Sequence, residues 1–233
     1  MKFRHLGGSR HLIQQEKKNF SIPLLIAALS LTIFALIALS ISDNQIHQFD
    51  DNLIGWIQGM EAPGMTKWMQ VFTWIGSGLP VIIITIISMI VLYLFLGHRR
   101  ELLFLAAVIA GSTLLNTLLK LAFQRARPTI HRIIEASGYS FPSGHSMAAF
   151  SLYGGLAFLI WKHIPTATGR VLMIIVSAAF ILTIGMSRIY LGVHYPSDIA
   201  GGYFLSGSWL GICIWFYQRY LERMSLLHSK PLT

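Results

Sequence analysis

Long apolar runs separated by short polar stretches make up most of this sequence. Six of these runs are candidates for helices that cross a bilayer, which requires about 20 apolar residues, within a range of about 17–25. In chain order they cover residues 21–41, 79–96, 102–123, 146–161, 171–186 and 199–217. The fourth and fifth runs are short, so we expect their helices to extend into neighbouring polar residues that line a cavity inside the bundle.

The pattern therefore predicts an all-α fold: an integral membrane bundle of six transmembrane helices. Residues 42–78, between the first two runs, carry apolar side chains at helical spacing with acidic and amide residues between them. This pattern predicts an amphipathic helix. Two interpretations remain open, because such a helix can lie at the membrane interface or cap the bundle. The apolar positions are Ile46, Phe49, Leu53, Ile57 and Met60, and an interfacial aromatic belt is suggested by Trp56, Trp68 and Trp74.

Composition supports a membrane protein of one domain. The chain has 233 residues, of which 54% are hydrophobic and 12% charged, whereas soluble domains carry about 25% charged residues. We expect a tail at 1–20, a six-span domain at 21–217 and a second tail at 218–233. The net charge of +9 does not indicate nucleic-acid binding, because most cations flank apolar runs. The single cysteine, Cys213, cannot form an intrachain disulfide, and its apolar surroundings predict a small buried side chain.

The distribution of lysine and arginine predicts the orientation of the bundle. Six spans place both termini on one side, and that side holds 12 of the 18 Lys and Arg residues. Cytoplasmic loops carry an excess of these residues, so both termini are expected in the cytoplasm. The six remaining cations lie on the extracytoplasmic side, five of them within or near three polar motifs.

These three motifs carry the candidate chemistry. They are Lys120-x6-Arg127-Pro128, then Pro142-Ser143-Gly144-His145, then Ser187-Arg188-x5-His194-x3-Asp198. On the six-span layout all three lie on the extracytoplasmic side, which supports a single site. The arginine guanidinium groups match phosphate bidentately, and lysine adds a point charge. The second motif begins an apolar helix and supplies Ser143 as its N-cap. A helix N-terminus is a ready anion site. Gly144 has no side chain, so a phosphate can approach the backbone closely there.

Two histidines and a carboxylate complete the set. His194 and Asp198 lie four residues apart around Pro196, which suits the first turn of a helix. The carboxylate could hold Nδ1–H and leave Nε2 free to attack, while His145 protonates the leaving oxygen and later activates water. Each motif alone is weak, since such a histidine–aspartate pair is often only a local hydrogen bond. Taken together, the order of the three motifs along the chain and their position on one side of the membrane favour a catalytic role. Arg125, Arg132 and Tyr139 are candidates for headgroup contact.

These motifs resemble those of the type 2 phosphatidic acid phosphatase superfamily, which comprises membrane lipid phosphatases and the related vanadium haloperoxidases. The resemblance covers all 11 fixed motif positions and, through the six-span layout, nearly the whole chain. It implies that His194 forms a phosphohistidine with Asp198 as its partner and His145 as general acid. It also implies that no metal or other cofactor is needed. The residues that would cradle the phosphate are Lys120, Arg127, Ser143, Gly144 and Arg188.

The short chain resembles the bacterial branch of phosphatidylglycerophosphatase B and undecaprenyl pyrophosphate phosphatase. This implies a cell-membrane enzyme whose site faces away from the cytoplasm and whose partners are membrane lipids, with no obligatory protein partner. Undecaprenyl pyrophosphate is the favoured substrate, because the recycled lipid carrier appears on that face. Phosphatidylglycerophosphate or phosphatidic acid is the alternative. A vanadium-dependent haloperoxidase is disfavoured by the apolar spans, and a non-catalytic lipid-binding protein leaves the two histidines unexplained.

Overall fold

The computed structural model describes residues 6–43, 45–96, 99–129 and 131–228, and within these ranges the chain is helical and has no strand. Each predicted run became a helix, and the predicted extensions into the motifs are confirmed. The α-helices are α1 (Leu6–Ser42), α2 (His47–Gln58), α3 (Pro63–Ile75), α4 (Gly78–Leu96), α5 (Arg99–Phe123), α6 (Gly144–Ile160), α7 (Ala167–Tyr190) and α8 (Pro196–His228), with a 3₁₀ turn η1 (Trp161–His163).

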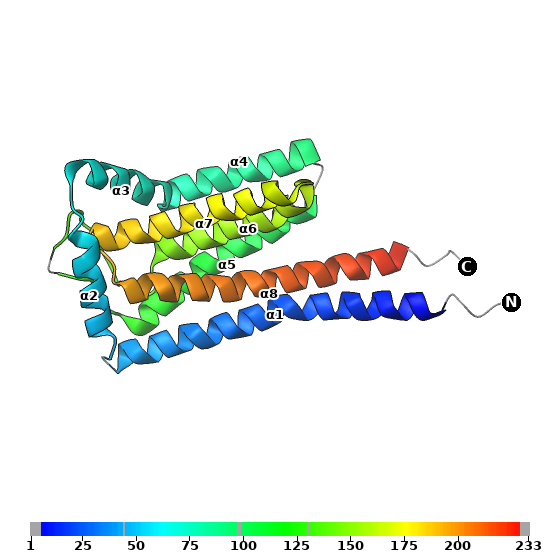
Figure 1. Cartoon of the computed structure of the whole chain (residues 1–233), viewed down its shortest axis with the longest axis horizontal. Coiled ribbons are helices and arrows are strands. Elements are labelled where there is room, and N and C mark those ends of the chain that lie inside the picture. The colour runs from blue at the N-terminus through cyan, green and yellow to red at the C-terminus, as the bar shows by residue number, and fades with distance from the viewer. Residues whose placement is uncertain (1–5, 44, 97–98, 130, 229–233) are drawn as a thin grey trace.

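The long helices run lengthwise through the molecule, and α2 lies across one end (Figure 1). Helix α1 begins and α8 ends at the opposite end of the molecule (Figure 1). Helix α3 meets α4 at an angle of 56°. The predicted tails at 1–20 and 218–233 are helical from Leu6 and as far as His228, where they continue α1 and α8.

Length and hydropathy qualify four described helices as membrane spans: the 22–42 part of α1, α5, α7 and the 196–226 part of α8. The bent pair α3 and α4 is a fifth candidate if it counts as one span. Helix α6 has 17 residues, which is at the short end for a crossing. The structure thus supports four or five spans by these criteria, and the count of six stays a prediction.

The surface of this fold is far more apolar than that of a soluble protein. Large apolar side chains face outward, including Leu25 at 67% and Leu29 at 63% exposure on α1, while polar Ser112, Ser151 and Ser206 are buried between helices. Exposed apolar faces of this extent need a hydrocarbon solvent. The protein is therefore a multi-pass membrane protein.

Helices α1 and α8 pack closely along their length (Figure 1). Gly211 makes this possible, since a Cβ there would lie 2.8 Å from the Pro23 carbonyl oxygen and 3.0 Å from the Ala27 Cβ. Gly207, one turn earlier, faces Ser30. Small residues four apart allow membrane helices to approach through dispersion contacts rather than hydrophobic exclusion.

The segment 42–78 folds as two helices, and α2 caps the bundle. Ile57 is fully buried and packs with Ile189, Tyr190 and Leu191 at the end of α7. The same helix also exposes Trp56 at 64%, so its outer face suits the membrane interface. The capping interpretation is therefore confirmed, and a position of α2 at the membrane interface stays a prediction.

Candidate active site

All three motifs lie at the end of the molecule that α2 covers (Figure 1). Lys120 is in the last turn of α5, and Arg127 is in the 124–143 segment that follows it. Arg188 is in the last turn of α7. The remaining predicted site residues are Ser143, Gly144 and His145 at the start of α6, His194 between α7 and α8, and Asp198 in the first turn of α8.

The start of α6 has the geometry predicted for an N-cap. Ser143 has extended backbone angles, and its hydroxyl accepts hydrogen bonds from the Ser146 amide at 3.4 Å and the Ser146 hydroxyl at 3.1 Å. The Ser143 amide donates to the Asp198 carbonyl at 3.1 Å, which joins the second motif to the third. A Cβ on Gly144 would lie only 3.1 Å from Asn116 Oδ1, so a glycine fits best there.

The His194–Asp198 pair is formed and buried. His194 Nδ1 lies 3.2 Å from Asp198 Oδ2, which also accepts the Tyr195 amide at 2.9 Å. Pro196 is the first residue of α8, as predicted. Burial lowers the pKa of His194 to about 4; Asp198 opposes this shift, and the Arg127 and Arg188 charges add to it. At neutral pH the imidazole is therefore uncharged.

Arg127 determines the tautomer of that imidazole. Its Nη1 lies 3.1 Å from His194 Nε2, and a guanidinium can only donate. Nε2 is therefore the acceptor, and the proton sits on Nδ1 facing the carboxylate. Backbone carbonyls of Ser137 and Gly138, each at 3.0 Å, and of Val193 at 2.8 Å hold the guanidinium in place. Burial lowers the pKa of Arg127.

The other predicted cations are also close to the two histidines. Lys120 Nζ donates to the Tyr139 carbonyl at 2.6 Å. Arg188 is 5% exposed and donates to the Thr73 hydroxyl, yet its buried Nε has no hydrogen-bond partner among the described residues. A buried guanidinium donor without a partner is costly, which suits an anion site. The electrostatic neighbours of His145 are Arg188, His194, Lys120 and Arg127.

Two charged residues beside this pair have roles that the sequence did not predict. Arg125 was a candidate for headgroup contact, and this is wrong: its side chain is 10% exposed and pairs with Asp198 at 2.7 Å and Asp50 at 2.8 Å. Asp50 is one of the acidic residues between the apolar positions of the predicted amphipathic helix, but it is fully buried. A signal was present, since Asp50 lies seven residues before Ile57 and therefore shares its buried face.

These groups can bind an oxyanion and attack it. Three cations and a helix N-terminus supply positive charge, and a neutral imidazole points its lone pair toward Arg127. Among the described residues, no group of three His, Cys, Asp or Glu side chains is arranged to hold a metal ion.

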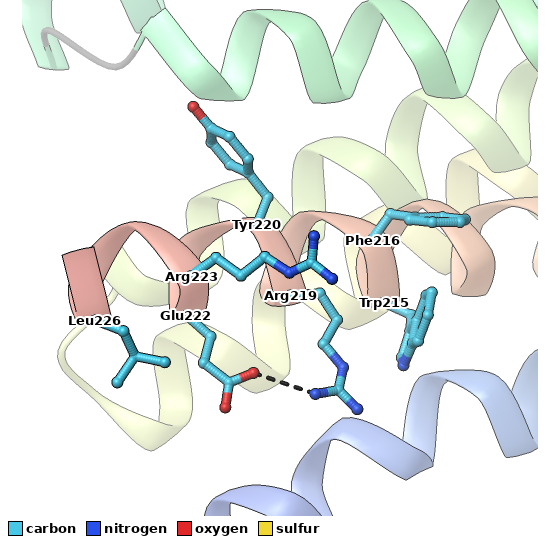
Figure 2. A pocket seen from close by; sticks show the side chains of 7 residues that line it. All are labelled: Trp215, Phe216, Arg219, Tyr220, Glu222, Arg223 and Leu226. Atoms are coloured by element: carbon cyan, nitrogen blue, oxygen red, sulfur yellow. Dashed lines mark hydrogen bonds and ion pairs between the residues drawn. The ribbon is translucent and has the colours of Figure 1, made fainter.

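A separate hollow of about 650 Å³ lies at the other end of α8 (Figure 2). Its lining includes Arg219, which pairs with Glu222 at 3.3 Å and lies over the Trp215 ring. Arg219 follows Asp198 by 21 residues, or roughly 30 Å of helix at 1.5 Å per residue. This hollow is therefore not part of the motif site.

Comparison with known proteins places these observations in a family. Residues 101–222 match the model of the PAP2 superfamily. Phosphatidylglycerophosphatase B of Bacillus subtilis is 32% identical over 74% of this chain and 85% of its own length. A putative undecaprenyl-diphosphatase of Escherichia coli, YbjG, is 30% identical over 52% of this chain and 61% of its own length.

Two crystal structures share the fold. The transmembrane PAP2 type phosphatidylglycerolphosphate phosphatase from Bacillus subtilis superposes with a TM-score of 0.73 and 25% identity, over 89% of this chain and 99% of that one. LpxE of Aquifex aeolicus gives a TM-score of 0.58 with 26% identity, over 72% of this chain and 94% of that one.

Proposed function

Because this chain belongs to the PAP2 superfamily and is a membrane lipid phosphatase, we propose that it hydrolyses a lipid phosphate or pyrophosphate through a phosphohistidine on His194. One observation carries the mechanism. The imidazole is neutral, its Nδ1 faces Asp198 and its Nε2 faces Arg127. The nucleophilic nitrogen therefore points to where a bound phosphate would sit.

In the first step, His194 Nε2 attacks phosphorus, and the bond from phosphorus to the leaving oxygen breaks. His145 donates a proton to that oxygen. The imidazole ring becomes positively charged, and the adjacent Asp198 carboxylate stabilises it while holding its orientation. Arg127, Arg188 and Lys120 balance the charge on the phosphoryl oxygens, and the amides at the start of α6 add their dipoles.

In the second step, water attacks the phosphohistidine. His145, now unprotonated, removes a proton from that water, and the phosphorus–nitrogen bond breaks. Inorganic phosphate leaves, and His194 returns to the neutral tautomer with its proton on Nδ1. Both histidines regain their starting states, so the cycle needs no further reactant.

We propose the six-span topology as well, with the bent pair α3–α4 contributing one crossing and α6 the shortest. Residues 21–217 would form the phosphatase domain, and residues 1–20 and 218–233 its cytoplasmic extensions. The cation distribution supports cytoplasmic termini, which puts the motif end on the extracytoplasmic face of the cell membrane. Trp56 and Trp74, exposed at 64% and 63%, suit that interface.

Undecaprenyl pyrophosphate is the substrate we propose to test first, because this carrier must be dephosphorylated on that face. Phosphatidylglycerophosphate is the second candidate, and the broad likeness to a phosphatidylglycerophosphatase B supports it. Phosphatidic acid is the third. Each presents a phosphate to the same cations, so the selection depends on the lipid-facing surface around the site.

The test is a phosphate-release panel on purified protein in detergent micelles, with these three lipids as substrates. We expect release from at least one lipid, none from His194→Ala, and full activity in His131→Ala, which removes an exposed imidazole. Phosphoenzyme trapped by rapid quench in alkaline detergent, where the phosphorus–nitrogen bond survives, should appear only where His194 is present. Release by His194→Ala at the wild-type rate would refute the mechanism.

Halide oxidation with added vanadate would favour a haloperoxidase. Wild-type release by a His145→Ala, His194→Ala double variant would favour a non-catalytic role for these histidines.

A further inference from the structure

A buried charged cluster outside the three motifs joins the cap helix α2 to the reacting pair. Asp50 Oδ1 accepts the Ser197 amide at 2.9 Å, and its Oδ2 accepts the Ser197 hydroxyl at 2.6 Å. The same Oδ2 accepts Arg125 Nη2 at 2.8 Å. Asp50 is fully buried, and Ser197 is 1% exposed. One carboxylate from α2 thus makes three bonds to the residues that flank Asp198.

Arg125 connects this carboxylate to Asp198. Its Nη1 donates to Asp198 Oδ1 at 2.7 Å and to the Ser197 hydroxyl at 2.7 Å, while Nη2 holds Asp50. The guanidinium lies over the Tyr195 ring, 4.1 Å from its centroid. Asp198 Oδ1 is therefore held by Arg125, so that Oδ2 faces His194.

The net charge of the cluster also suits the positive charge that His194 gains during the proposed reaction. Asp50 and Asp198 carry two negative charges and Arg125 one positive, and buried ions of this kind are tolerated only when paired. When His194 attacks phosphorus, its ring gains one positive charge beside Asp198. The net negative charge of the cluster then favours the state that forms during the reaction.

We infer that Asp50 is a positioning residue for the proposed phosphatase reaction, acting on His194 through Arg125, Ser197 and Asp198. This inference rests on the proposed function. Asp50 need not touch the substrate. It holds Arg125 and the first turn of α8 so that the Asp198 carboxylate meets Nδ1. The cap helix therefore completes the site as well as covering it.

The kinetic test compares Asp50→Asn with Asp51→Asn, which neutralises the neighbouring, exposed carboxylate. For Asp50→Asn we expect kcat to fall by about 10–100-fold, the loss typical when the hydrogen-bond partner of a metal-binding side chain is removed. KM should stay near the wild-type value, because the phosphate-binding cations are unchanged. Asp51→Asn should retain both constants. Each value is normalised to folded protein measured by size exclusion and thermal unfolding.

A pH profile separates positioning from a purely structural role. The charged or titratable groups around His194 are Asp198, Arg127, Arg188 and His145, with Arg125 and Asp50 behind Asp198. Removing the Arg125 charge leaves Asp198 free to stabilise protonated His194. Arg125→Gln should therefore move the acid limb of kcat/KM to higher pH, whereas Arg125→Lys keeps the charge and leaves the limb in place.

The outcomes distinguish this inference from the proposed function. If the wild type releases no phosphate from any lipid in the panel, the proposed function fails. If the wild type is active but Asp50→Asn keeps kcat while its melting temperature falls, Asp50 only anchors α2 and the inference is overturned. An unmoved acid limb in Arg125→Gln overturns it too. If Asp50→Asn does not fold, the pH profiles of Arg125→Gln and Arg125→Lys still test the inference.

Discussion

Replacing Asp198 with asparagine tests whether the carboxylate keeps the lone pair of His194 on Nε2. Three donors converge on this side chain. His194 Nδ1 at 3.2 Å and the Tyr195 amide at 2.9 Å reach Oδ2, and Arg125 Nη1 reaches Oδ1 at 2.7 Å. A carboxylate accepts on both oxygens, whereas an amide accepts on one side and donates on the other.

The amide oxygen of the variant should turn toward Arg125, since a bond to a charged donor is about twice as strong as a neutral one. Its NH₂ group then faces the Tyr195 amide, which loses its acceptor, and His194 Nδ1, which can accept a bond from it only without its own proton. The ring proton moves to Nε2, and the nucleophilic lone pair is lost. The opposite orientation would set the NH₂ against a buried guanidinium, which is costlier.

The expected loss is large because the tautomer itself becomes wrong. In a Ser–His–Asp triad, the same carboxylate-to-amide change lowers kcat about 10⁴-fold, which corresponds to about 5 kcal/mol of activation free energy. We expect a loss of that order for Asp198→Asn. KM should change little, since Lys120, Arg127 and Arg188 still bind the phosphate.

The assay is steady-state phosphate release from the best lipid of the panel in micelles, with thermal unfolding measured on the same preparation. Asp51→Asn is the matched control, because it makes the same chemical change at an exposed position. A loss of less than about tenfold, the effect of 1.4 kcal/mol, in a folded variant would refute the tautomer mechanism.

Four further predictions concern vanadate, chelation, pH and two glycines. Vanadate should inhibit phosphate release, because its trigonal form resembles the transferring phosphoryl group. EDTA should leave phosphate release intact, and complete loss of release in EDTA would contradict a metal-independent reaction. Activity should fall as pH drops through about 4, the lowered pKa of His194, because Nε2 is free above that pH and protonated below it. The measurement is a profile of kcat/KM against pH. An acid-side fall centred near pH 6.5 would contradict this prediction. Gly192→Ala should cost more stability than Gly138→Ala, as measured by thermal unfolding. Gly192 has a φ of +73° and Gly138 a φ of +72°, and a side chain in this left-handed region costs about 1–2 kcal/mol. Only at Gly192 would a Cβ also collide with the His131 carbonyl oxygen. Equal losses of stability in the two variants would show that the collision is relieved.

The fold was predictable wherever periodicity and length decided it. The apolar runs became helices because a continuous apolar segment can satisfy its backbone in lipid only as a helix or a closed barrel. Ser143 capped α6 and Pro196 opened α8 because these residues carry local preferences for helix starts. The bend between α3 and α4 was not predicted, since it depends on how α3 packs on α7 while α4 packs on α5 and α6.

The candidate site was predictable only in part. The motif residues lie at the ends of predicted helices, and the six-span layout puts these ends on one side of the membrane. Their convergence therefore follows from helix ends that meet on one face of a bundle. Asp50 has no motif around it, and its neighbour Asp51 has the same side chain in the same helix. Which of the two is buried depends on the rotation of α2 against α7 and α8, which the packing of Ile57 sets.

By itself, the sequence determined the membrane class, the helices, and a set of cations and histidines suited to phosphate, because each follows from local composition and spacing. The tertiary structure alone decided that Arg125 is an internal ion-pair partner and that a carboxylate from the cap helix supports it. The physical reason is that burial and charge pairing are properties of surfaces brought together from distant parts of the chain. Asp50 looks solvated in the sequence, but it is buried because Arg125, from another part of the chain, supplies its counterion.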